Sequence, residues 1–427
     1  MRRRFVVPAI IILSLTASAA SAQEIVLRHA LEGAPLDALS TLVLRFNDGQ
    51  KGRAKVVLQG VAAVEDRRQL PHLALLEPED GMRFFDTRPR FKPLHAMMRE
   101  SGEKLDEARF LPQMADAVDD LTGRVQGLPL ALAMPVLFYN KEAFLKAGLD
   151  PEVPPKTWWE VQKIAGALLD VGLDCPLTTS RFAWVHLENI SSQHGEPMLA
   201  RNGKTDQVAL NGMVHVKHVA LLASWHKSLY FHYFGPGREG DARFLSGKCA
   251  MLTGESSLHA DLAHPPRFPV GVAALPYYDD VYGARPADVL PDGAALWALP
   301  GKKVEEYRVA ARFVSFLLKP EVQREWVRAT GFLPMTKSAL NALKEAASMG
   351  VAPMVLEAVE KRLSAPRQKM ARTKLGFGRN KVREILGEEI EFVWGNTKPA
   401  KEALDTAMLR ANGALVPPAA GQLEAWR

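Results

Sequence analysis

The chain has 427 residues, of which 47% are hydrophobic and 24% charged, a composition typical of a folded globular protein. Its formal net charge is +6, and no long run of Lys and Arg concentrates that charge, which argues against a nucleic-acid-binding protein. Because this length exceeds what one hydrophobic core usually organises, we expect two lobes.

The first 22 residues have the three-part layout of a secretory signal peptide. Residues 2–4 are arginines, residues 5–15 form a largely apolar run, and the small residues at 20–22 form a cleavage site. The apolar run is too short to span a bilayer. We therefore predict export and cleavage after Ala22, which lowers the formal net charge from +6 to +3; an uncleaved N-terminal anchor is the alternative.

Strands and helices alternate at the start of the mature chain. Short apolar strands are predicted at 25–27, 54–58 and 73–76, and the last of them runs into a turn-rich segment at 77–81. Between the first two strands, apolar residues recur at helical spacing on one face: Leu36, Leu39, Leu42, Val43 and Phe46. This alternation favours an α/β lobe with a mostly parallel sheet.

The same kind of pattern resumes after residue 133. An apolar segment at 134–139 is followed by a short helix, and Thr157 is the expected N-cap of a long amphipathic helix that begins at Trp158. Further strands are predicted at 175–179, 249–253, 268–272 and 294–299, with helices at 305–318 and from 384 onward.

The mature chain contains two cysteines, Cys175 and Cys249. In an oxidising compartment two buried cysteines can pair, and the alternative is two separate buried thiols that behave as small apolar residues. No CxxC motif and no His/Cys cluster with metal-site spacing occurs in the sequence. We therefore predict neither a metal site nor a cofactor.

Six motifs follow one another along the chain. They are 135–151 (PVLFYNKEAFLKAGLDP), 154–158 (PPKTW), Trp184 with 187–189 (LEN), 247–251 (GKCAM), 330–337 (TGFLPMTK) and 402–407 (EALDTA). In this order they resemble the extracellular solute-binding proteins of carbohydrate-type ABC importers, and within that family the branch that binds sn-glycerol 3-phosphate. The resemblance covers nearly the whole mature chain, although residues 59–90 are shortened and match poorly.

The resemblance implies an α/β fold of the two-lobed periplasmic binding protein type (type II, maltose-binding-protein-like). Such a protein has two mostly parallel sheets flanked by helices, and three hinge crossings about which the lobes close on ligand. Lobe I is then expected to comprise 23–132 and 257–331, and lobe II 133–256 and 332–427. Because Cys175 and Cys249 both begin strands of lobe II, we predict a disulfide between them.

The function implied by the resemblance is transport and not catalysis. We expect a monomeric periplasmic receptor that binds a small polar molecule and delivers it to an inner-membrane complex of ABC permease and ATPase, with no nucleic-acid partner. An exported hydrolase is a distant alternative, because the run 254–258 (GESSL) superficially resembles a nucleophile elbow but lacks the second glycine of GxSxG. We predict no catalytic residue.

Ligands of open α/β sheets bind beyond the carboxyl ends of the strands. In this sequence those ends carry Glu79, 180–184, 254–257 and 291–293. Trp184 is the strongest candidate, because an aromatic face holds the C–H surface of a polyol while the indole donates one hydrogen bond. The alternative for Trp184 is core packing.

Two further candidates offer groups for an anion. Arg181 stands where the resembling proteins have tryptophan, and its guanidinium suits a phosphate or carboxylate; a solvated surface arginine is the alternative. Gly293 leaves its backbone N–H open to an oxyanion, and a simple turn glycine is the alternative. The remaining candidate ligand-binding residues are Glu79, Glu255, Ser256, Phe332 and Arg379.

The anion-binding pattern of the resembling proteins is altered in this chain. A serine is replaced at Ala131 or Ala133, a second serine by Glu255 next to Ser256, a tyrosine by Phe332, and an arginine by Leu375, with Arg372 and Arg379 nearby. Losing three or four donors would weaken phosphate binding by roughly 5 kcal/mol or more. Overall similarity still favours sn-glycerol 3-phosphate or a glycerophosphodiester, with a sugar held by Glu79, Glu255 and Trp184 as the alternative.

Overall fold

The computed structural model describes residues 23–60, 70–76, 91–119, 123–202, 205–262, 267–286, 288–345, 351–363 and 379–415. The predicted signal peptide at 1–22, the candidate residue Glu79 and the positions Arg372 and Leu375 lie outside the described residues. Within the described part of the chain, no helix is long and apolar enough to cross a membrane.

One five-stranded sheet has the order β2 (Ala54–Gly60), β1 (Gln23–His29), β3 (Leu73–Leu76), β12 (Asp292–Ala298) and β4 (Leu128–Ala133). Helix α1 (Gly33–Gly49) buries Leu39, Leu42, Val43 and Phe46, four of the five residues of the predicted apolar face, whereas Leu36 is half-buried. The other helices of this lobe are α3 (Leu94–Glu100), η2 (Glu107–Arg109), α4 (Pro112–Asp116), α10 (Val304–Leu317), α11 (Pro320–Thr330) and α12 (Lys337–Glu345).

A second five-stranded sheet has the order β11 (Val270–Ala274), β5 (Pro135–Asn140), β10 (Met251–Glu255), β6 (Leu177–Thr179) and β9 (Phe231–His232). Its helices up to η4 are α5 (Lys141–Lys146), α6 (Trp158–Asp170), η3 (Ala183–Glu188), α7 (Asn189–His194), α8 (Met213–Lys227), α9 (Glu239–Leu245) and η4 (Ser256–Ala260). After α12 come α13 (Val351–Leu363), α14 (Arg379–Trp394) and α15 (Ala400–Ala414). Strands β7 (Leu199–Asn202) and β8 (Thr205–Val208) form a separate hairpin.

The expected two-lobed α/β architecture is confirmed, but both sheets are mixed and not mostly parallel. β1 runs parallel to β2 and β3, and β6 runs parallel to β9 and β10. All four antiparallel pairs of these two sheets involve β12 or β5, which lie next to the segments that cross between the lobes. β11, inside the segment 257–331 that we assigned to lobe I, is bonded to β5 in the second sheet. Helix α12, inside the segment 332–427 that we assigned to lobe II, packs against α11 of the first lobe, so the predicted boundaries do not follow the packing at these two places.

The three predicted crossings lie side by side and are hydrogen-bonded to one another. Met134 of the first crossing forms two hydrogen bonds with Ser256 of the second crossing. The Ser256 amide donates to the Met134 carbonyl (2.8 Å), and the Met134 amide donates to Ser256 Oγ (3.1 Å). The third crossing joins the first where the Leu333 amide donates to the Leu132 carbonyl (2.9 Å). Movement of the lobes about these segments remains a prediction.

Cys175 and Cys249 form a disulfide, with their Cα atoms 4.5 Å apart. They precede β6 and β10, which are parallel neighbours in the second sheet. The predicted pairing is therefore confirmed, for the reason given: adjacent parallel strands bring two early residues within bridging distance.

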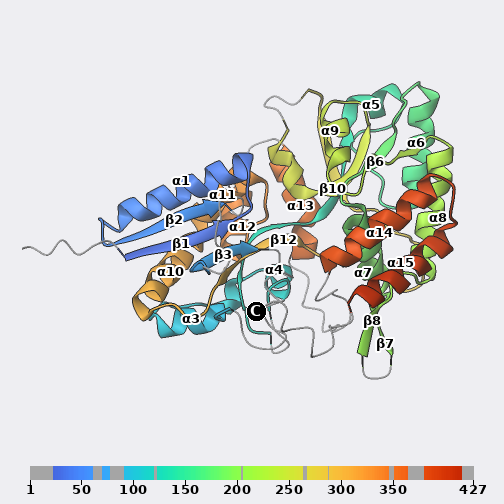
Figure 1. The fold of residues 1–427 in the computed structure, drawn as a ribbon. Coiled ribbons are helices and arrows are strands. Elements are labelled where there is room, and N and C mark those ends of the chain that lie inside the picture. Colours follow the sequence, from blue (N-terminus) through green and yellow to red (C-terminus); the bar gives the residue numbers. More distant parts are fainter. Residues whose placement is uncertain are drawn as a thin grey trace, which may run out of the picture.

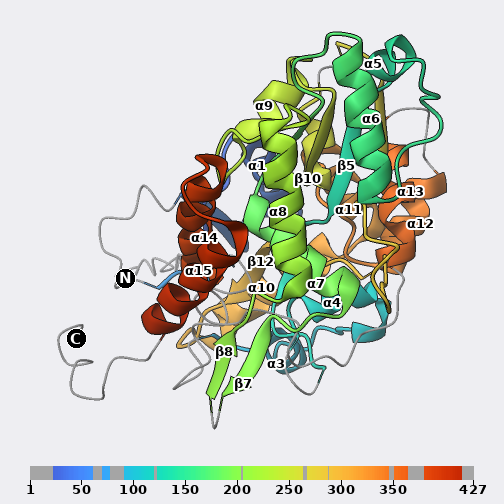
Figure 2. The same ribbon diagram turned by 90° about the vertical axis from the view of Figure 1, so that its right-hand side faces the viewer.

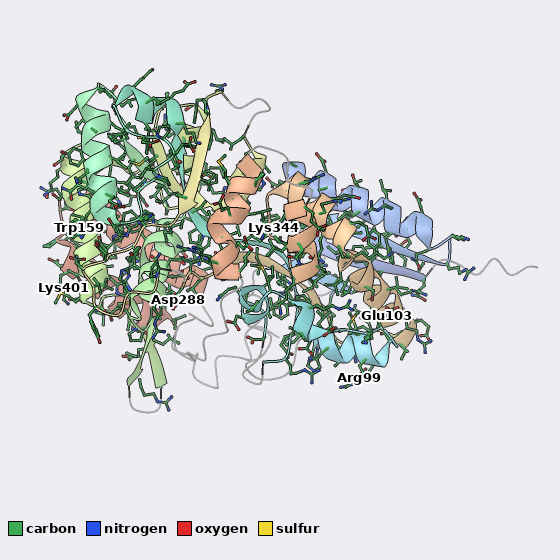
Figure 3. All side chains as sticks on the ribbon, turned by 180° about the vertical axis from the view of Figure 1, so that it is seen from behind. Arg99, Glu103, Trp159, Asp288, Lys344 and Lys401 are labelled. Carbon is green, nitrogen blue, oxygen red and sulfur yellow. A yellow bond between two sulfur atoms is a disulfide. The ribbon has the colours of Figure 1, made fainter. Side chains whose placement is uncertain are left out.

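Figure 1 shows the two lobes next to each other, with the first sheet beneath α1 and with α5, α6 and α8 around the second sheet. In Figure 2 the C-terminal helices α14 and α15 lie beside α8, in agreement with their contacts. Figure 3 places Trp159 and Lys401 on the lobe of the second sheet, and Arg99 and Glu103 on the other lobe. The C-terminal helices therefore complete the second lobe.

Candidate ligand-binding site

Two neighbouring strands of the second sheet end at the junction with the first lobe. β6 ends at Thr179 and β10 at Glu255, and the two run parallel, so Arg181 and Glu255 follow the same edge of the sheet. β12 of the first sheet begins at Asp292. Helix α14, drawn in red in Figure 1, extends toward β12 and contributes Arg383. These four side chains meet between the lobes.

Asp292 is the centre of this meeting point. Its side chain is 0% exposed, and its Oδ2 atom accepts hydrogen bonds from Arg181 Nη2 and from Arg383 Nη1, the latter at 2.8 Å. Asp292 belongs to the first sheet, whereas both arginines belong to elements that pack around the second sheet. One buried carboxylate therefore links the two lobes through two guanidinium groups.

Arg181 extends the contact to Glu255. Its Nη1 donates to Glu255 Oε2 at 2.6 Å, and the guanidinium lies 4.8 Å from the centre of the Trp184 ring. Its backbone has a φ of 49°, a left-handed conformation that few non-glycine residues adopt. Arg181 is thus no solvated surface arginine: a strained backbone holds its side chain between two carboxylates.

Arg383 is held by a second acidic partner. Its Nε and Nη2 donate to the two carboxylate oxygens of Glu188 at 2.5 and 3.0 Å. Burial by itself lowers the pKa of Arg383, but the charges of Asp292 and Glu188 outweigh it, so the pKa is raised. The guanidinium is therefore firmly charged, and its bidentate pair with Glu188 fixes its direction.

A third arginine closes the series. Arg238 contacts Glu255 Oε1 at 3.4 Å, Asp241 Oδ2 at 2.8 Å and Asp261 Oδ2 at 3.3 Å. We call the whole set the interlobe ion network: Glu188, Arg383, Asp292, Arg181, Glu255, Arg238, Asp241 and Asp261. It holds three guanidinium groups and five carboxyl groups, so acidic groups outnumber basic ones.

Trp184 is buried, with 1% of its surface exposed. Its indole N–H donates to the Leu290 carbonyl at 3.1 Å, and it lies in the π-helical turn η3. This burial is what the alternative for Trp184, core packing, would produce. In this structure it packs beneath Arg181 and ties η3 to the segment that leads into β12.

The other sequence candidates are distributed differently. Gly293 has a φ of 132°, and a Cβ atom there would lie 2.1 Å from the Ala131 carbonyl oxygen, so close approach of β4 requires the glycine. The Ser256 hydroxyl accepts a hydrogen bond from the Met134 amide of the first crossing. Phe332 stacks on Trp326, with ring centroids 6.0 Å apart. Arg379 begins α14, one helical turn before Arg383.

Sequence reasoning missed Arg383, Glu188 and Arg238, and did not assign a role to Asp292. A signal existed for Arg383, because it lies four residues after Arg379 and so on the same face of a helix. Asp292 was among the residues expected at the carboxyl end of a strand, but the structure places it at the start of β12, which runs antiparallel to β4 and so begins at the junction. Nothing in the sequence links Glu188 to Arg383, which is 195 residues away. Arg238 has a near neighbour in Asp241, three residues on, but its contact with Glu255 depends on the fold.

A chain of buried histidines lies directly behind the two strand ends. His186 Nε2 contacts the hydroxyls of Thr179 and Thr253 (2.9 Å each), and its Nδ1 contacts His218 Nε2 at 2.8 Å. His218 Nδ1 in turn contacts the Tyr278 hydroxyl at 2.8 Å. Burial lowers the pKa of His186 to about 3 and that of His218 well below its usual value. These neutral rings connect the strands that position Arg181 and Glu255.

The described residues contain no group of three or more His, Cys, Asp or Glu side chains placed to hold a metal ion. The site is instead built from hydrogen-bonding and charged groups at the junction of two α/β lobes with three crossings. That arrangement defines a two-lobed binding protein. A family model for bacterial extracellular solute-binding proteins matches residues 75–351, and the chain belongs to this family.

Curated relatives support the same conclusion. The sn-glycerol-3-phosphate-binding periplasmic protein UgpB of Yersinia pseudotuberculosis is 33% identical over 94% of this chain and 94% of its own length. UgpB of Salmonella typhimurium is 34% identical with the same coverage of both chains. The chain is therefore a solute-binding receptor of an ABC importer and not an enzyme.

Solved structures confirm the fold. UgpB from Mycobacterium tuberculosis, in complex with glycerophosphocholine, superimposes with a TM-score of 0.72 at 19% identity, covering 92% of this chain and 99% of the other. The cyclic α-maltosyl-1,6-maltose binding protein from Arthrobacter globiformis gives a TM-score of 0.70 at 21% identity, with the same coverage of both chains. At these identities the likeness concerns the fold alone.

Proposed function

We propose that the chain is a periplasmic receptor that binds a small glycerol-phosphate-type solute between its lobes, sn-glycerol 3-phosphate or a glycerophosphodiester. The observation that carries this proposal is the convergence of Arg181 and Arg383 from one lobe on the edge of the other. Guanidinium groups bind phosphate oxygens through paired, charge-assisted hydrogen bonds. The relatives at 33–34% identity, named as sn-glycerol-3-phosphate-binding proteins, support the same class of solute.

In this proposal the mature protein is a monomer released into the periplasm by cleavage after Ala22. Binding closes the two lobes about the crossings near Met134, Ser256 and Leu333, and the closed form docks on an inner-membrane permease and ATPase complex. The hydrogen bonds between the crossings support this, because they keep the three segments together while the lobes on either side rotate.

Isothermal titration calorimetry tests the solute class. Wild-type protein, unfolded and refolded to remove any retained solute, is titrated with sn-glycerol 3-phosphate, glycerophosphocholine and maltose at 50 and 200 mM salt. We expect one of the two glycerol phosphates to bind, with a smaller scattering radius of gyration at saturation. Binding of neither glycerol phosphate would refute the proposal.

A pair of variants localises the binding. Arg181→Ala removes one of the converging guanidinium groups and should weaken binding of the glycerol phosphate by at least about tenfold, the value of one charge-assisted hydrogen bond. Arg45→Ala is the matched control, because Arg45 forms an exposed ion pair with Glu325 elsewhere on the protein. Equal losses in the two variants, or none in Arg181→Ala, would place the solute elsewhere.

A carbohydrate is the second candidate, and the carboxylates of the interlobe ion network favour it. Glu255 and Asp292 can accept hydrogen bonds from sugar hydroxyls, as charged planar side chains do in polar binding sites. The protein from Arthrobacter globiformis, of the same fold, is named as a maltosyl-maltose binding protein. Tight binding of maltose, with no binding of either glycerol phosphate, would establish this alternative.

A further inference from the structure

We infer that Asp292 determines the specificity of this receptor by acting as an internal anion between Arg181 and Arg383, and so excludes doubly charged phosphate monoesters. This inference rests on the proposed function. Among glycerol-phosphate solutes, the site then favours one without a dianionic group, such as a zwitterionic phosphodiester, over sn-glycerol 3-phosphate.

Carboxylates already occupy both guanidinium groups. The two guanidinium groups that are best placed to receive a phosphate both donate to the same oxygen of Asp292. Each also donates to a second carboxylate, Arg181 to Glu255 and Arg383 to Glu188. A phosphate that enters must therefore compete with carboxylates already held in place, and it gains less than it would from unpaired arginines.

Acidic groups outnumber basic groups at the junction between the lobes. The interlobe ion network contains three guanidinium and five carboxyl groups. Burial raises the pKa of the Asp241 carboxyl, and the other four acidic side chains by themselves outnumber the three arginines. Because charges interact strongly at a partly buried junction, a dianion is repelled more than a monoanion, and a zwitterion least.

Both carboxylates lie at ends of strands that meet at the junction. Asp292 pairs with Ala133 across β12 and β4, and Glu255 pairs with Pro135 across β10 and β5. These side chains accept hydrogen bonds but donate none, so they offer a phosphate no hydrogen-bond donor.

The test measures the affinity of Asp292→Asn, which keeps the shape of the side chain and removes its charge. The probes are sn-glycerol 3-phosphate, glycerophosphocholine and inorganic phosphate, each titrated calorimetrically at 50 mM salt. We expect wild type to bind glycerophosphocholine at least tenfold more tightly than sn-glycerol 3-phosphate. Asp292→Asn should gain at least tenfold for sn-glycerol 3-phosphate and for inorganic phosphate, and this gain should exceed any change in its affinity for glycerophosphocholine.

Asp280→Asn is the matched control, because Asp280 is an exposed aspartate paired with Lys217 outside the network. It should bind all three probes as wild type does. If circular dichroism shows that Asp292→Asn does not fold, Glu255→Ser takes its place, since it frees one nitrogen of Arg181 and should produce the same direction of change.

The inference is overturned if the folded variant gains less than threefold for both sn-glycerol 3-phosphate and inorganic phosphate. It is also overturned if wild type prefers sn-glycerol 3-phosphate. Failure of the proposed function has a different signature: wild type then binds neither glycerol phosphate, while a gain of inorganic phosphate binding in Asp292→Asn still supports the role of Asp292.

Discussion

Lowering the pH from 7.5 to 5.0 should destabilise the second lobe through three buried histidines. His186, His215 and His218 are each 0% exposed. Burial away from water disfavours the charged imidazolium form of each ring. Burial lowers the pKa of His186 to about 3 and of His215 to about 4, and lowers that of His218 strongly.

The direction follows from proton linkage. In the unfolded chain these histidines titrate near pH 6.5. Below that pH the unfolded state binds protons that the native state, with its lower pKa values, does not bind. The contribution of these histidines to the free energy of unfolding is therefore fully present above that pH. It is lost as the pH falls from about 6.5 toward the native pKa values. Between pH 7.5 and 5.0 each histidine costs about 2 kcal/mol, and the three together about 6 kcal/mol.

Urea denaturation followed by circular dichroism at pH 7.5, 6.5, 5.5 and 5.0 measures this dependence. His215→Gln should reduce the loss by about 2 kcal/mol, because it deletes one of the three buried histidines while its amide can still reach Ser191. His95→Gln, on α3 of the other lobe, is the control and should follow wild type. An identical pH dependence in wild type and His215→Gln would refute the reasoning.

Three further predictions concern stability and are checked by denaturant unfolding. Trp184→Ala should lower the free energy of unfolding by about 3–5 kcal/mol, because it removes a fully buried aromatic ring. An unchanged unfolding midpoint would show that this ring does not stabilise the fold. The double variant Cys175→Ser/Cys249→Ser should lose about 4 kcal/mol, since the disulfide closes a loop with a sequence separation of 74, and two titratable thiols in unfolded, non-reduced wild type would contradict it. Gly331→Ala should cost about 1–3 kcal/mol more than Gly148→Ala, because both have positive φ but only the first would place a Cβ 2.2 Å from the Ser257 carbonyl; equal costs would argue against a tight crossing.

The secondary structure was largely predictable because it depends on neighbouring residues. The apolar spacing of α1 predicted its buried face, and Thr157 forms a capping box with Glu160 at the start of α6, as a local side-chain and backbone pattern allows. The predicted strand at 268–272 is observed at Val270–Ala274, and the predicted helix at 305–318 at Val304–Leu317. Such shifts of one or two residues are usual at element ends.

Sheet direction was less accessible. Whether β5 and β12 run parallel or antiparallel to their neighbours depends on where the chain crosses between lobes, and apolar runs look alike in both cases. The disulfide could be predicted only in part from the residues themselves. Composition left the pairing of Cys175 and Cys249 open, and the family resemblance, by placing both in one lobe, favoured the pairing that the sheet order confirms.

By itself the sequence determined the class of this protein: an exported-type leader pattern, alternating strands and helices, and motifs that resemble solute-binding receptors. Only the tertiary structure decided how the junction between the lobes is charged. Arg181 and Arg383 lie 111 and 91 residues from Asp292 along the chain, and Glu188 lies 195 residues from Arg383. No local pattern reports such pairs, because their partners are selected by the packing of two sheets and by the burial that makes an unpaired charge costly.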